Sequence, residues 1–82
     1  MDEQEFVRQK RADWERFHKI LLKAERRGDS QRLTREEAQE FGSLYRRLSS
    51  DLCFARSRAR STDLIQHLNA LLTRAYTLLY DT

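Results

Sequence analysis

Apolar residues recur every three or four positions along three separate stretches of the chain. The middle stretch is the most regular, and its apolar positions are Ala38, Phe41, Tyr45, Leu48, Leu52, Ala55 and Ala59. The first stretch carries Trp14, Phe17, Leu21 and Ala24, and the last carries Leu64, Leu68, Leu71, Ala75 and Leu78. This spacing places each set on one face of an α-helix. The pattern therefore predicts three amphipathic helices.

Polar residues between these stretches indicate where the helices begin and end. Gly28 follows a periodic segment and suits a C-terminal cap, because glycine adopts the left-handed backbone conformation at no steric cost. Thr34 and Glu37 have the spacing of a capping box, in which each residue caps the other's backbone amide. Ser61 is a candidate N-cap for the last helix. Helices are therefore expected at about residues 3–27, 35–59 and 63–80.

Short connections between three such helices predict an all-α fold, an antiparallel three-helix bundle. A chain of 82 residues has the size of one domain, so we assign residues 1–82 to a single bundle. The first helix is expected to be longer than the third by several turns, with a start that protrudes or frays. The side chains expected in the core are Trp14, Phe17, Leu21, Phe41, Tyr45, Leu48, Leu52, Leu68, Leu71 and Ala75.

One acidic residue lies beside the apolar positions of the middle helix. Counting residues outward from the turns brings Asp51 level with Arg74, the only lysine or arginine of the third helix. We predict a partly buried ion pair between them that fixes the register of the helices, a use known for shielded charges. The alternative is a charge switch or ligand site. Asn69 is expected to form a hydrogen bond across the bundle, the alternative being that it faces water beside the apolar positions.

The residues that could act in catalysis or metal binding do not have the spacing that such a site needs. His18 and His67 have no cysteine or acid at ligand spacing, and a zinc site needs at least three protein ligands. Ser50 and Asp51 are neighbours on a helix and point about 100° apart, which argues against a triad with His67. No glycine-rich phosphate loop is present. We therefore predict no enzyme activity, catalytic residue, cofactor, metal or small-molecule substrate.

The basic residues gather in the second half of the middle helix. The net charge is only +3, but five arginines follow within a short stretch, namely Arg46, Arg47, Arg56, Arg58 and Arg60. Once the apolar face is turned inward, they spread over more than half of the helix circumference, which favours an ordinary solvated surface. The alternative is contact with an anionic surface, either lipid or nucleic acid. Nucleic acid is disfavoured because no stacking aromatic residues lie outside the expected core.

Features of membrane insertion and export are lacking in the sequence. No apolar run approaches the roughly 18 residues of a membrane helix. The first residues are acidic, unlike those of a secretory signal. The single cysteine, Cys53, cannot form an intrachain disulfide, which agrees with a reducing compartment. These features predict a soluble, cytoplasmic location for this part of the protein.

Two motifs give the chain a family resemblance. The segments LYRRLSSDL and LNALLTRAYTLLY, together with Trp14 and the Gly28 turn, resemble the soluble N-terminal region of bacterial membrane proteins of the stage II sporulation protein M-like family. The residues that carry it are Tyr45, Arg46, Asp51, Leu52, Asn69, Leu72, Arg74, Ala75 and Tyr80. Tyr76 and Leu79 depart from it, because the family commonly has histidine and isoleucine there.

The resemblance implies a non-enzymatic docking or assembly domain at the cytoplasmic face of the bacterial cell membrane, preceding membrane-spanning helices that this sequence lacks. A protein partner is then expected, and the membrane would be reached through a downstream segment. The alternative is a stand-alone helical module that self-associates through Phe6, Val7 and Phe54, which the three apolar faces do not account for. A further alternative is weak binding of anionic lipid or nucleic acid through the arginines.

Overall fold

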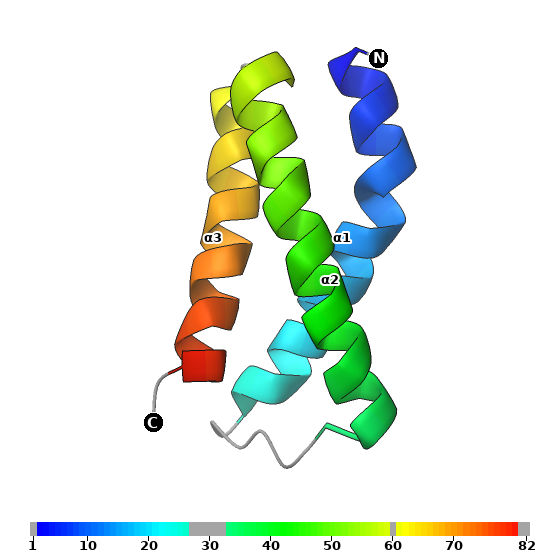
Figure 1. Cartoon of the computed structure of the whole chain (residues 1–82), viewed down its shortest axis with the longest axis vertical. Helices are drawn as coiled ribbons and strands as arrows, with labels where there is room; N and C mark the ends of the chain where they lie inside the picture. Colours follow the sequence, from blue (N-terminus) through cyan, green and yellow to red (C-terminus); the bar gives the residue numbers. More distant parts are fainter. Residues whose placement is uncertain (1, 27–32, 60, 81–82) are drawn as a thin grey trace.

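The computed structural model describes residues 2–26, 33–59 and 61–80. It contains helix α1 (Glu3–Glu25), helix α2 (Arg35–Phe54), a single π-helical turn η3 (Ala55–Ala59) and helix α3 (Thr62–Tyr80). Figure 1 shows α1 and α3 running in one direction and α2 running back between them. These residues form no strand, so the predicted all-α class with three helices is confirmed. The arrangement is compatible with an antiparallel bundle.

The helices begin at local capping interactions. Asp2 caps α1 by accepting a hydrogen bond from the backbone amide of Glu5 at 2.8 Å. The predicted capping box is confirmed, with Thr34 and Glu37 each accepting from the other's backbone amide at 3.0 and 2.9 Å. Ser61 accepts from the amide of Leu64 at 3.3 Å. The cap predicted at Gly28 lies outside the described residues, and α1 ends at Glu25, before the expected residue 27.

The end of the middle helix differs from the prediction of one α-helix to residue 59. The α-helix ends at Phe54, and the π-helical turn η3 replaces its last residues. The hydroxyl of Ser57 donates to the carbonyl oxygens of Cys53 and Phe54, at 3.0 and 3.3 Å. A serine that bonds back to these carbonyls loosens and bends a helix, and π-helices occur mostly as single turns. The weakly helical serine and arginine stretch therefore leaves α-helical geometry.

The core lies along the line where the three helices meet. Most side chains expected there are buried, namely Trp14, Phe17, Leu21, Phe41, Leu48, Leu52, Leu68, Leu71 and Ala75. Tyr45 is only half-buried, and Ala38, which the periodicity had placed on the apolar face, is exposed. Leu44 is buried in their place. Phe41, Leu44 and Leu48 share one face of the helix, and this face points into the core. The helix α2 is therefore rotated about its axis relative to the orientation that would bury Tyr45 and Ala38.

The start of α1 is packed, which corrects the expectation that it protrudes. Phe6 is 2% exposed, its ring stacks on Phe54 at a centroid distance of 4.4 Å, and it meets the edge of Trp14 at 5.7 Å. Val7 is half-buried and packs against the core. Because α2 and η3 together extend alongside the whole of α1, they cover its first turns. The apolar surface predicted for self-association at Phe6, Val7 and Phe54 is therefore largely covered by the chain itself.

A larger side chain at Gly42 is expected to fit and to increase the stability of the fold. It lies inside α2, and a Cβ atom at this position would have no neighbour within 4 Å. Alanine lowers the backbone entropy of the unfolded chain, so Gly42→Ala should raise the free energy of unfolding by about 0.5–1 kcal/mol. Urea denaturation followed by circular dichroism measures this change. A loss of stability would show that the open space at Gly42 is needed by the fold.

Candidate functional site

Asp51 is the one buried charged residue among the described residues, and its partners differ from the predicted one. Its side chain accepts a hydrogen bond from the indole nitrogen of Trp14 at 2.9 Å. Its other oxygen lies 3.7 Å from the ammonium group of Lys10. Both partners come from α1. The predicted ion pair between Asp51 and Arg74 is therefore wrong, because Asp51 is on the side of α2 that faces α1 and not α3.

Arg74 instead joins the far end of α1 to α3. Its guanidinium group donates two hydrogen bonds to Glu25, at 3.0 and 2.5 Å. The predicted hydrogen bond from Asn69 is not found among the described residues, where Asn69 is exposed. Asp51 and Arg74 thus each join α1 to another helix, through different partners on α1.

A row of exposed ion pairs accompanies Asp51 along the contact of α1 with α2. Asp13 pairs with Arg47, Arg16 with Glu40 and Lys23 with Glu37, at 3.3, 2.9 and 2.8 Å. The residue numbers rise along α1 while they fall along α2, and the stacked rings of Phe17 and Phe41 join the same two helices beside the pair of Arg16 with Glu40. Each exposed pair contributes little alone, but the row is consistent with a single register of the two helices.

Three glutamates in these pairs make stability depend on pH. Hydrogen bonds from Arg74, Lys23 and Arg16 lower the pKa of Glu25, Glu37 and Glu40 below the ordinary value of 4.5. The folded carboxylates therefore bind protons less tightly than the unfolded ones. Their contribution is present above about pH 4.5 and is lost as the pH falls through the lowered pKa values.

We expect the free energy of unfolding, measured in urea, to fall between about pH 5 and about pH 3. Glu25→Gln should reduce this dependence because it removes one of the three shifted groups. Glu36→Gln is the matched control, since Glu36 is an exposed glutamate for which no ion pair with a described residue is formed. A dependence on pH that is identical in wild type and Glu25→Gln would contradict the assignment.

The arginines considered for an anionic surface do not share one role. Arg47 is held by Asp13 at 3.3 and 3.4 Å. Arg46, Arg56 and Arg58 are exposed, and none of them forms an ion pair with a described residue. Arg60 lies outside the described residues. Arg56 and Arg58 belong to η3, beside the start of α3 in Figure 1, and Arg46 lies further down α2.

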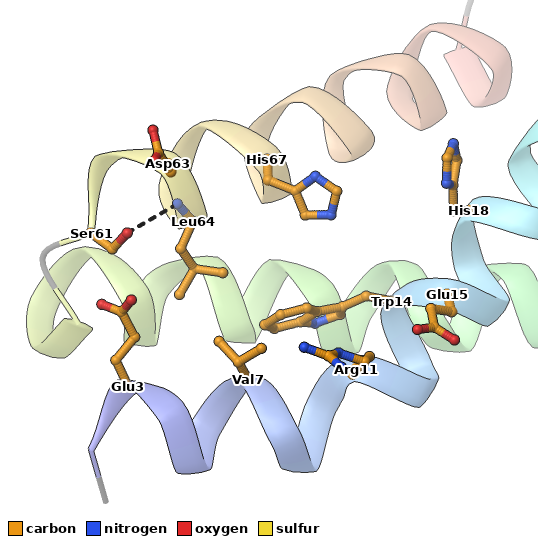
Figure 2. A pocket seen from close by; sticks show the side chains of 10 residues that line it. All are labelled: Glu3, Val7, Arg11, Trp14, Glu15, His18, Ser61, Asp63, Leu64 and His67. Carbon is orange, nitrogen blue, oxygen red and sulfur yellow. Dashed lines mark hydrogen bonds between the residues drawn. The ribbon is translucent and has the colours of Figure 1, made fainter.

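A groove separates the first turns of α1 from those of α3. It has a volume of about 560 Å³ and is lined by Glu3, Val7, Arg11, Trp14, Glu15, His18, Ser61, Asp63, Leu64 and His67. Figure 2 shows Val7, Trp14 and Leu64 between the two helices, with His67 reaching down from α3. The ion pair of Glu25 with Arg74 ties α1 to α3 beyond the end of the groove. Among the described residues that line the groove, no ion pair joins α1 to α3.

Both histidines of the chain line this groove. His18 comes from α1 and His67 from α3, and Figure 2 places them at different points along the same groove. Sequence periodicity could not reveal this, because it fixes which face of a helix is apolar but not how far apart two helices lie. Within the described residues no group of histidine, cysteine and acidic side chains is arranged to hold a metal ion. The free thiol of Cys53 is exposed and lies outside the groove.

Large apolar side chains are exposed mainly near the end of α3. Tyr76, Leu79 and Tyr80 are 56%, 47% and 64% exposed, and the two tyrosine rings lie 4.7 Å apart. We call these three residues the tyrosine–leucine cluster. Figure 1 places this end of α3 opposite to the end at which η3 lies.

None of the described helices is both long and apolar enough to span a bilayer.

Comparison with known proteins places the chain in a family. No curated protein and no solved structure gives a significant match. The family model described as "Domain of unknown function (DUF8413)" matches residues 4–81, which is nearly the whole chain. The protein therefore belongs to the family of the domain of unknown function DUF8413.

Proposed function

We propose that this chain is a non-enzymatic docking and assembly domain, an antiparallel three-helix bundle at the cytoplasmic face of the bacterial cell membrane. In this proposal it precedes the membrane-spanning part of a stage II sporulation protein M-like protein. Its role is to bind a protein partner, and no small molecule is converted. The alternative is a stand-alone module that self-associates. It has the same docking role but is not attached to a membrane.

The observation that carries the docking role is the tyrosine–leucine cluster. Elsewhere in the described chain the aromatic residues are buried or half-buried and most leucines are buried, Leu22 being an exception at 49% exposed. Tyr76, Leu79 and Tyr80 are about half exposed or more. Tyrosine is enriched at protein interfaces and at membrane surfaces, because its ring is apolar and its hydroxyl group is polar. A contiguous cluster of this kind favours an interaction over an ordinary solvated surface.

The resemblance to stage II sporulation protein M-like proteins supports the membrane context. Several residues that carry it have structural roles here. Asp51 bonds to Trp14, Arg74 bonds to Glu25, and Leu52, Leu72 and Ala75 are buried. The resemblance therefore includes residues that specify the fold, and we extend it from the fold to the location of the domain.

Fractionation of the native cells tests this proposal. An antibody against the domain is used to immunoblot the soluble and membrane fractions. A band well above the 9.9 kDa of this chain in the membrane fraction is the expected result. A soluble band near that mass would overturn the membrane context and leave the self-associating module, which sedimentation at several protein concentrations would then detect.

A second candidate function is contact with an anionic lipid surface. It is favoured by the exposure of Arg46, Arg56 and Arg58 without a described ionic partner. However, η3 and the end of α3 lie at opposite ends of a molecule 39 Å long (Figure 1). If the end of α3 leads toward the membrane, Arg56 and Arg58 point toward the cytoplasm and would meet an acidic protein instead.

Vesicle flotation separates these two uses of the arginines. Lipid contact predicts that the chain floats with anionic vesicles but not with neutral ones, and that Arg56→Gln with Arg58→Gln weakens flotation, since each exposed base contributes up to about 1 kcal/mol near such a surface. Equal failure to bind both kinds of vesicle would remove the lipid candidate. If the chain retains nucleic acid at low salt and loses it steeply as salt is added, the arginines bind nucleic acid instead.

A further inference from the structure

We propose that the groove between α1 and α3 binds a basic amphipathic helix of a protein partner. This inference rests on the proposed docking function and assigns it a second surface, distinct from the tyrosine–leucine cluster. The groove has a volume of about 560 Å³, and its lining residues come from α1, from α3 and from Ser61 just before α3. Its shape calls for a convex occupant, and helices that dock in this way insert a row of apolar side chains.

The floor of the groove supplies the apolar contact. Val7 is half-buried, Leu64 is buried, and Trp14 is 5% exposed, and all three line the groove. Val7 and Trp14 come from α1 and Leu64 from α3, and Figure 2 draws all three between these two helices. An occupant with apolar residues at helical spacing can therefore contact α1 and α3 at once.

The charge of the lining selects a basic occupant. Three carboxylates line the groove, those of Glu3, Glu15 and Asp63, against the single guanidinium group of Arg11. With both histidines neutral, the lining carries a net charge of −2, whereas the chain as a whole carries +3. None of the three carboxylates forms an ion pair with a described residue. Lysines or arginines flanking an apolar stripe would complement them.

Trp14 makes the groove directly observable. It is the only tryptophan of the chain and it lines the groove. The probe is a helical peptide of leucine and lysine in which leucine forms one face, and its matched counterpart has glutamate in place of every lysine. Neither peptide contains tryptophan, so any change in tryptophan emission reports on Trp14. We expect the lysine peptide to shift this emission in a saturable way and the glutamate peptide to leave it unchanged.

Charge reversal on the groove wall locates the binding. Glu3→Lys and Glu15→Lys should each lower the affinity for the lysine peptide about fivefold, because each replaces an attractive charge with a repulsive one. Glu36→Lys is the matched control, because Glu36 lies in the first turn of α2 as Glu3 lies in the first turn of α1. The control should change the affinity by less than about twofold. Circular dichroism checks that each variant is folded.

Two results would overturn the groove assignment. One is equal weakening by Glu36→Lys and by the groove variants, which would mean unspecific attraction to the whole surface. The other is the absence of any peptide-dependent change at the methyl groups of Val7 and Leu64 in NMR spectra of the unmodified chain, a measurement that needs no variant. Either result leaves the cell fractionation unaffected, so failure of this inference is distinguishable from failure of the proposed function.

Discussion

Replacing Trp14 with alanine is expected to lower the free energy of unfolding by about 3–5 kcal/mol. The side chain is 5% exposed, packs against Phe6 and bonds to Asp51, so its removal leaves a cavity at the contact of α1 with α2. Domains have about 0.05–0.15 kcal/mol of stability per residue, which is about 4–12 kcal/mol for this chain. The variant should therefore be largely unfolded if the domain lies at the low end of that range.

Urea denaturation followed by circular dichroism at the helix signal measures the loss. Tyr76→Ala is the matched control, since it also removes an aromatic ring from a helix but from an exposed position. Substitutions at such positions usually change the free energy of unfolding by less than about 0.5 kcal/mol. Equal losses in the two variants would show that burial of Trp14 is not what stabilises the contact.

Replacing Asp51 with alanine is the second large effect. The indole N–H of Trp14 would then be buried without an acceptor, which costs about 1–3 kcal/mol. The ammonium group of Lys10 adds little to this cost, because its side chain is 36% exposed and can turn to water. Asp51→Asn should cost less than Asp51→Ala, since the amide oxygen can still accept from Trp14.

A double-mutant cycle separates the hydrogen bond from other effects. Trp14→Phe keeps an aromatic ring but removes the N–H donor, so Asp51→Ala should cost less in that background than in wild type. The difference between the two costs is the coupling between the residues, expected at about 1 kcal/mol. Strict additivity of the two substitutions would contradict a stabilising hydrogen bond. The same denaturation measurements supply all four free energies.

The features that depend on neighbouring residues were readable from the sequence. The capping box needs only Thr34 and Glu37, three positions apart, and its geometry follows once a helix starts there. The α-helical limits at Arg35 and near Tyr80 follow from local caps and from periodicity. The failure at the end of α2 also has a local cause, since Ser57 bonds back to two carbonyl groups. The sequence showed that this stretch was weakly helical but not which geometry it takes.

The partners of charged residues could not be read in this way. Counting from the turns estimates how far along the bundle a residue lies, and Asp51 and Arg74 are compatible by that measure. It does not determine the direction in which each side chain points, and a difference of one residue rotates that direction by about 100°. The rotation of α2 that buries Leu44 in place of Tyr45 turns Asp51 toward Trp14. Arg74 forms its hydrogen bonds with Glu25 instead.

The sequence by itself determined that three amphipathic helices form, where two of them are capped, and most of the core, because these depend on backbone hydrogen bonds and apolar spacing within each segment. Only the tertiary structure decided the partners of Asp51 and Arg74, the burial of Phe6 and the groove between α1 and α3. These features depend on the rotation and separation of helices far apart in the chain. Those quantities follow from how all the side chains pack together, which the periodicity of any one helix leaves undetermined.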